Sequence, residues 1–180
     1  MPYWEALGPG AYIIKARVQL LRDLGPAVAP MNAFLFLQGL ETLSLRMERH
    51  FANAQAVAEY LDAHDKVESV SYAGLESSQW HSRAVELGGG KGFGSIVAFD
   101  IVGGREPGQA FVGALDLHSH VANIGDAKSL VIHPSSTTHS QLSEVEQAAA
   151  GVRPGLVRLS VGLETIDDII ADLDAGFASL

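Results

Sequence analysis

From residue 67 onward the sequence alternates short apolar segments with segments of helical periodicity. Strands are predicted at 67–72, 95–101, 121–123, 129–133 and 156–162, and helices at 106–115, 143–150 and from 165 onward. Strands that alternate with helices pack as a sheet covered by those helices. The pattern therefore predicts an α/β fold with a small sheet.

Long helices are predicted ahead of this alternating region. Apolar residues at helical spacing predict a helix over 11–24, ended at Gly25, and a longer helix over 31–64. Gly39 and Asn53 are the positions at which the longer helix is expected to bend. The mean hydropathy of +0.16 is high for a small chain and indicates apolar faces that another surface covers.

Charge and cysteine content exclude several classes of function. The chain has 12 basic and 21 acidic residues, and its net charge of −9 would repel the phosphates of a nucleic acid. The lack of cysteine excludes a disulfide scaffold, thiolate catalysis and cysteine-ligated metals, and it fits a cytoplasmic protein. No segment approaches the roughly 18 uninterrupted apolar residues of a membrane span, and the first residues lack the layout of a signal peptide.

Several familiar motifs fail on spacing. In the glycine run 88–94, Lys91 is followed by glycine where a phosphate loop needs Ser or Thr, so we interpret the run as a pliable surface loop. No nucleophile elbow is present. We interpret the hydroxyl-rich residues 135–138 as a turn that caps its own backbone, with a loop that faces a ligand as the alternative.

Seven histidines raise the question of a metal site. His118 and His120 would share one face of a strand, and His133 and His139 flank the polar turn. No carboxylate or third histidine stands at recognisable ligand spacing, so no metal site is predicted.

Arg158 lies within a segment that otherwise reads as a buried strand. Alternation places it on one face with Leu156 and Ser160, and places the apolar residues of 157–161 on the other face. A buried guanidinium needs a partner. Physical chemistry alone favours an ion pair within the protein, for example with Glu164. The alternative is a bidentate contact with the carboxylate of a ligand.

Two blocks of the sequence carry a specific resemblance. The segments NIGDAKSLVIHP and RLSVGLE, within 123–139 and 156–168, resemble the C-terminal signature of the Cys/Met-metabolism family of pyridoxal-phosphate enzymes. Segments 8–25 and 32–50, together with Asn123 at the start of the first block, are similar to the O-acetylhomoserine sulfhydrylase branch.

The resemblance implies roles for three residues. Arg158 matches the arginine that grips the α-carboxylate of the amino-acid substrate, and Asn123 matches a position that holds the same carboxylate. Thr138 falls where the loop of the family closes over the substrate. The implied fold is the C-terminal small domain of a type I pyridoxal-phosphate transferase, preceded by long helices, with residues 1–29 as the last helical segment of the large domain and 30–180 as the C-terminal domain.

The resemblance also implies the cofactor and the activity. Enzymes of this branch use pyridoxal 5'-phosphate to replace the acetyl group of O-acetyl-L-homoserine by sulfide, which gives homocysteine for methionine biosynthesis, and they form homotetramers. None of the four lysines stands in the context of the Schiff-base lysine. We therefore expect a C-terminal portion that binds no cofactor and is inactive without the large domain. The alternatives are a methionine γ-lyase or cystathionine γ-synthase activity, and a free-standing interaction module.

Overall fold

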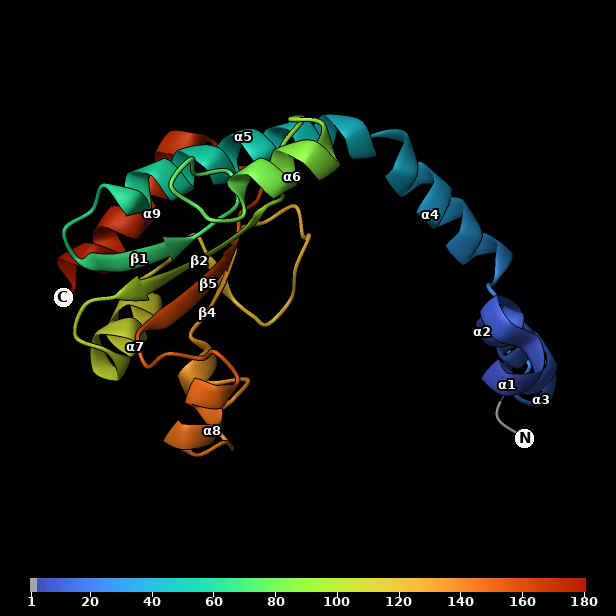
Figure 1. Ribbon diagram of the computed structural model, residues 1–180. Helices are drawn as coiled ribbons and strands as arrows, with labels where there is room; N and C mark the ends of the chain where they lie inside the picture. The colour runs from blue at the N-terminus through green and yellow to red at the C-terminus, as the bar shows by residue number, and fades with distance from the viewer. Residues whose placement is uncertain (1–2) are drawn as a thin grey trace. The chain divides into compact units, whose positions relative to one another are not determined.

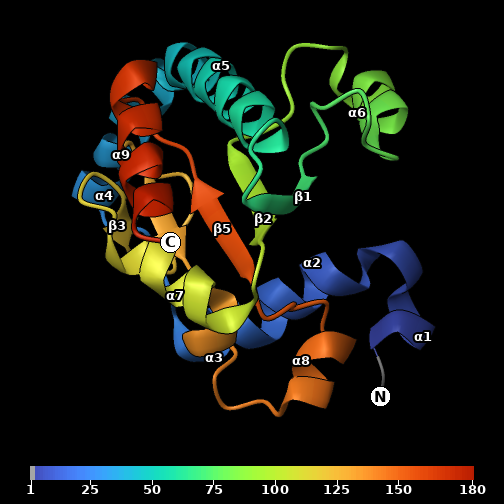
Figure 2. The same cartoon turned by 90° about the vertical axis from the view of Figure 1, so that its left-hand side faces the viewer.

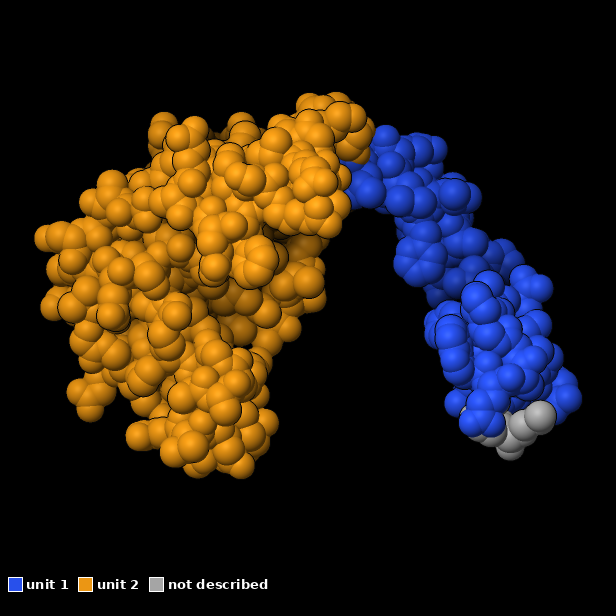
Figure 3. Space-filling view, viewed as in Figure 1, with its two compact units in different colours: residues 1–43 blue, residues 44–180 orange. Residues whose placement is uncertain are grey.

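The computed structural model describes residues 3–180, and the chain divides into two compact units, Met1–Leu43 and Ser44–Leu180 (Figure 3). We call them unit 1 and unit 2. The α-helices of unit 1 are α1 (Tyr3–Leu7), α2 (Ala11–Lys15), α3 (Arg22–Leu24) and α4 (Pro30–Glu41). The assignment of 1–29 and 30–180 to two domains of a larger protein stays a prediction.

The predicted helix over 11–24 is confirmed. A π-helical turn (Ala16–Leu21) joins α2 to α3 without a break in the helical backbone. Gly25 ends the helix in the left-handed conformation, with φ of 65°, which glycine adopts without steric cost.

The helix predicted over 31–64 is divided, but both predicted bend points are wrong. It consists of α4 and α5 (Leu43–Asp62), and the break lies at Thr42, whose φ of −107° and ψ of 8° leave the helical region. Gly39 stays helical. Asn53 stays helical too, because its buried side chain donates hydrogen bonds to other segments and not to its own helix.

Unit 2 is built on a five-stranded sheet with the strand order β1-β2-β5-β4-β3. The strands are β1 (Val67–Ser71), β2 (Ile96–Ile101), β3 (Ser119–His120), β4 (Leu130–Ile132) and β5 (Leu156–Ser160). Neighbouring strands are antiparallel, except that β3 runs parallel to β4. The small α/β sheet predicted from the sequence is thereby confirmed.

The strand predicted at 121–123 is wrong. The backbone N–H of Val121 donates to the carbonyl of Ser119, and that of Asn123 donates to the carbonyl of Val121. These tight turns use donors that a strand would direct to its neighbour, so pairing ends at His120 and the segment is a loop.

Five α-helices accompany the sheet in unit 2. Besides α5 they are α6 (His81–Gly88), α7 (Arg105–Gly113), α8 (Glu144–Ala149) and α9 (Ile166–Ala178). The capping box predicted for Ser143 and Glu146 is present at the start of α8. Thr165 occupies the N-cap position of α9, but its side chain makes no capping hydrogen bond. We did not predict α6.

The two faces of the sheet differ. Val97, Phe99, Val157 and Leu159 are fully buried in a core with side chains of α5, α7 and α9. Figures 1 and 2 show α5 and α9 on the same side of β5. The opposite face of β5 carries Arg158, as the alternation predicted. In the part of the chain that the structure describes, no helix combines the length and hydropathy needed to cross a membrane.

Candidate functional site

Arg158 lies at the centre of β5, and among residues 3–180 its side chain has one hydrogen-bond partner. Its cross-strand neighbours are Ala98 on β2 and Ile132 on β4, which offer no charge. Nη2 donates to the backbone carbonyl of Asn123 at 3.2 Å, whereas the buried Nε has no partner. A half-buried guanidinium with unused donors has the chemistry to bind an anion.

The ion pair between Arg158 and Glu164 is absent, so that expectation is wrong. Both carboxylate oxygens of Glu164 accept hydrogen bonds from Ser129, at 2.7 Å from the backbone N–H and 2.9 Å from the hydroxyl. Within residues 3–180, no carboxylate lies in salt-bridge distance of Arg158.

Asn123 lies on the exposed loop 121–128, which follows β3 and leads to β4. Its carbonyl accepts the hydrogen bond from Arg158, and its side-chain Oδ1 accepts one from the backbone N–H of Ile124 at 2.9 Å. The loop is attached to β5 a second time, because the N–H of Gly125 donates to the hydroxyl of Ser160 at 3.1 Å. The structure thus brings Asn123 and Arg158 together.

The hydrogen bond of the Thr138 side chain joins it to a neighbouring residue and not to Arg158 or Asn123. Its hydroxyl lies 2.9 Å from Nδ1 of the neighbouring His139, in the turn after the 3-10 helix Pro134–Ser136. Gln147 of α8 fixes this turn by donating to the carbonyls of Ser135 and His139. The expected capping of the backbone by hydroxyls is found at Thr137, which donates to the carbonyl of His133. A role of Thr138 in substrate binding stays a prediction.

Sequence reasoning missed the side chains of α5 that support β5. His50 Nδ1 lies 2.7 Å from the carbonyl of Val161, and Asn53 Nδ2 donates to the carbonyls of Gly162 and Glu164 at 2.9 and 3.0 Å. Both side chains are buried on the apolar face of α5. A polar residue on an otherwise apolar helix face needs a buried partner, and that signal could have identified them.

The histidines do not assemble into a metal site in the described part of the chain, where no three His, Asp or Glu side chains gather to hold an ion. His118 and His120 do not share a strand face, since His118 precedes β3. The His118 ring is buried and lies 2.6 Å from Asp172 of α9. Burial alone would raise the pKa of Asp172, but hydrogen bonds from the His118 ring and the backbone amides of residues 116–118 hold it below its ordinary value.

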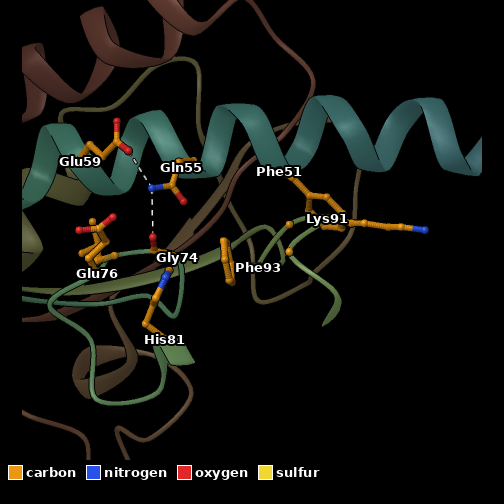
Figure 4. Close-up of a pocket in the computed structure, with 11 residues that line it drawn as sticks. Phe51, Gln55, Glu59, Gly74, Glu76, His81, Lys91 and Phe93 are labelled. Atoms are coloured by element: carbon orange, nitrogen blue, oxygen red, sulfur yellow. Dashed lines mark hydrogen bonds between the residues drawn. The ribbon is translucent and has the colours of Figure 1, made fainter. Parts of the chain in front are cut away.

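A cavity of about 490 Å³ lies between α5 and the glycine run 88–94 (Figure 4). It contains none of the residues predicted for substrate binding. Phe51, Gln55 and Glu59 line one wall, and Gln55 donates to Glu59 and to the carbonyl of Gly74. The interpretation of the glycine run as a surface loop is confirmed, and an added Cβ at Gly92 would overlap the ring of Phe51.

The four lysines have different surroundings. The amino group of Lys66 donates to the carbonyl of Phe177 at 2.8 Å, and that of Lys15 lies over the ring of Tyr3. Lys91 lines the cavity, but Figure 4 shows its side chain extending away from Glu59 and Glu76. Lys128 is exposed on the loop 121–128.

Comparison with known proteins identifies similar sequences. The profile of the family described as "Cys/Met metabolism PLP-dependent enzyme" matches residues 10–178. An O-acetyl-L-homoserine sulfhydrylase of Leptospira meyeri is 52% identical over 100% of this chain, and one of Corynebacterium glutamicum is 54% identical over 97% of it. The chain spans only 42% and 40% of the length of these relatives.

Comparison with solved structures also finds a similar protein. A Campylobacter jejuni protein, described as an O-acetylhomoserine (thiol)-lyase with N'-pyridoxyl-lysine-5'-monophosphate, has a TM-score of 0.81 and 40% identity to this chain. The match covers 96% of this chain and 41% of that protein.

Proposed function

The chain belongs to the Cys/Met-metabolism family of PLP-dependent enzymes, and from this we propose that it is part of an O-acetyl-L-homoserine sulfhydrylase. Such an enzyme replaces the acetyl group of O-acetyl-L-homoserine by sulfide and releases homocysteine. We propose that the present chain contributes the site for the α-carboxylate of the amino-acid substrate, and that the protein works in the cytoplasm as a homo-oligomer.

The observation that carries this proposal is the guanidinium of Arg158, which is half-buried and lacks an acidic partner among residues 3–180. A planar guanidinium matches the two oxygens of a carboxylate, and partial burial strengthens the attraction. The carbonyl of Asn123 fixes the orientation of the guanidinium. The side-chain amide of Asn123 supplies a further N–H donor that a carboxylate can accept.

In the proposed role these residues position the substrate. A carboxylate gripped by Arg158 fixes one end of the amino acid, so that the bond at its α-carbon keeps one orientation. Pyridoxal phosphate, when bound, supplies an electron sink for negative charge at that carbon. The described residues fit the carboxylate end of the substrate, and the amino groups of Lys15 and Lys66 are engaged elsewhere. We propose that another part of the whole protein holds the cofactor.

Kinetics of Arg158 variants in the full-length protein test the proposal. We expect Arg158→Ala to raise the KM for O-acetyl-L-homoserine by about 10- to 100-fold, the range for loss of hydrogen bonds to a charged group. The KM of Arg158→Lys should lie between those of wild type and Arg158→Ala, because lysine keeps the positive charge but cannot form two parallel hydrogen bonds to a carboxylate. The KM for sulfide should not change. Arg83→Ala, at an exposed arginine that pairs with Glu86, is the control. Near-normal kinetics of Arg158→Ala would contradict the assignment.

A further inference from the structure

Glu164 lies just after β5, and its carboxylate holds the end of the loop that carries Asn123. Its Oε1 accepts the backbone N–H of Ser129 at 2.7 Å, and its Oε2 accepts the hydroxyl of Ser129 at 2.9 Å. The Ser129 oxygen accepts in turn the N–H of Gly162 at 2.9 Å, and Ser129 is 0% exposed. Hydrogen bonds to a carboxylate are roughly twice as strong as bonds between neutral groups.

The space around this carboxylate is filled. A Cβ added at Gly162 would collide with Oε2 of Glu164, and it would lie 2.5 Å from the backbone nitrogen of Ser129 and 2.6 Å from the carbonyl of Ala127. Glycine is therefore needed at position 162 for Glu164 to approach Ser129 so closely. The contact is a built feature of the fold and not a surface encounter.

The backbone of Glu164 is fixed by α5. Arg49 Nη2 and Asn53 Nδ2 both donate to its carbonyl, at 3.2 and 3.0 Å. A carboxylate attached to a fixed backbone loses little entropy when it binds Ser129. The chain of contacts therefore runs from α5 through Glu164 to Ser129.

The loop 121–128 depends on such anchors, because all its residues are exposed. Besides the bond between Arg158 and the carbonyl of Asn123, the loop is held by Gly125 on Ser160 and by Ala127, whose carbonyl accepts the N–H of Leu163 at 2.9 Å. Ser129 directly follows the loop. Its two hydrogen bonds to Glu164 fix the position at which the loop ends. Glu164 is also the acidic residue nearest to Arg158 in the sequence, and these bonds use both of its carboxylate oxygens.

We propose that Glu164 is a positioning residue for carboxylate binding: through Ser129 it fixes the loop 121–128 so that Asn123 stays on Arg158, and, being bound to Ser129, it does not pair with Arg158. This inference rests on the function proposed above. It adds a second requirement for the site. The carboxylate of Glu164, which acts through Ser129 and not by contact with the substrate, must be present for the substrate carboxylate to bind.

The test uses the full-length enzyme loaded with pyridoxal phosphate and the variants Glu164→Gln, Ser129→Ala and both together. Glutamine keeps the size but places an N–H donor against Ser129, which itself donates. We expect Glu164→Gln to raise the KM for O-acetyl-L-homoserine about ten-fold, while kcat and the KM for sulfide change less than about two-fold, as loss of uniform binding requires. Ser129→Ala should act in the same direction, and the double variant should be no worse than the worse single variant, because both changes break one link.

The matched control is Glu146→Gln, since Glu146 also accepts hydrogen bonds from the N–H and hydroxyl of a serine, Ser143, in the capping box of α8. A purely structural loss would lower the melting temperature in both glutamine variants and leave each KM unchanged. If wild-type enzyme shows no turnover of O-acetyl-L-homoserine with sulfide, the proposed function fails. If wild type is active but Glu164→Gln keeps the wild-type KM for O-acetyl-L-homoserine, the proposed role of Glu164 is wrong. It is also wrong if Glu164→Gln lowers kcat and raises the KM values for both substrates together. Should Glu164→Gln not fold, Ser129→Ala decides.

Discussion

Unit 1 and unit 2 are both rich in apolar residues, but they use them differently. In unit 2 the rings of Phe99 and Phe111 are fully buried in the core beneath the sheet. In the described part of unit 1, Ala11 is the one buried hydrophobic residue, and Phe34 and Phe36 of α4 are 54% and 65% exposed. Apolar composition therefore does not make a core by itself: the strands of unit 2 bring distant side chains together, and the helices of unit 1 gain no such burial within their own unit.

Removing one phenylalanine ring from each unit should give the largest difference in the free energy of unfolding. We expect Phe99→Ala to lower the free energy of unfolding of the 180-residue chain by about 3–5 kcal/mol, as for other buried phenylalanines. Phe36→Ala should change it by less than about 0.5 kcal/mol, because the ring is already exposed. Urea unfolding followed by circular dichroism measures both. Equal destabilisation by the two variants would contradict the difference between the units.

The same difference explains how far the fold could be predicted. The strands of unit 2 were predictable because buried positions alternate along β2 and β5 and leave a period of two in the sequence. The break at Thr42 was not predictable from α4, where the helix ends without a glycine or proline at the break. Asn53 misled for a related reason, since its partners are the carbonyls of residues 162 and 164, more than a hundred positions away.

The candidate site was predictable only in part, for the same reason. Alternation placed Arg158 on the face away from the core, and the resemblance added Asn123. The expected pair with Glu164 was reasonable from proximity in sequence, but Ser129, thirty-five positions earlier than Glu164, takes both of its oxygens. Pairings of this kind depend on how β4 and β5 lie together, which local sequence does not encode.

A methyl group added at one glycine of each unit should change the stability less, and in opposite directions in the two units. Gly162→Ala in unit 2 should destabilise the chain by about 1–3 kcal/mol, because the Cβ has no room beside Ser129 and Ala127. Gly39→Ala in α4 should stabilise it by up to about 1 kcal/mol, because its Cβ meets no atom within 4 Å and alanine favours a helix. Opposite signs in thermal unfolding are the expected result. A neutral Gly162→Ala would show that the loop end can move, and would also weaken the proposed role of Glu164.

The smallest expected effect is a dependence on pH that belongs to unit 2 alone, because unit 1 contains no histidine. Burial is the main cause that lowers the pKa of His133 below its ordinary value of 6.5. Its Nε2 donates to the carbonyl of Pro154 at 2.7 Å, which favours the charged ring, but burial and the positive charge of Arg105 outweigh this bond. Below pH 6.5 the unfolded chain binds more protons than the folded one, so the free energy of unfolding should fall as the pH drops from 6.5 toward the folded-state pKa. Urea titrations between about pH 7.5 and 5 should show a shallower slope for His133→Asn than for wild type, whatever its absolute stability. Equal slopes would mean that His133 does not titrate differently in the folded and unfolded states.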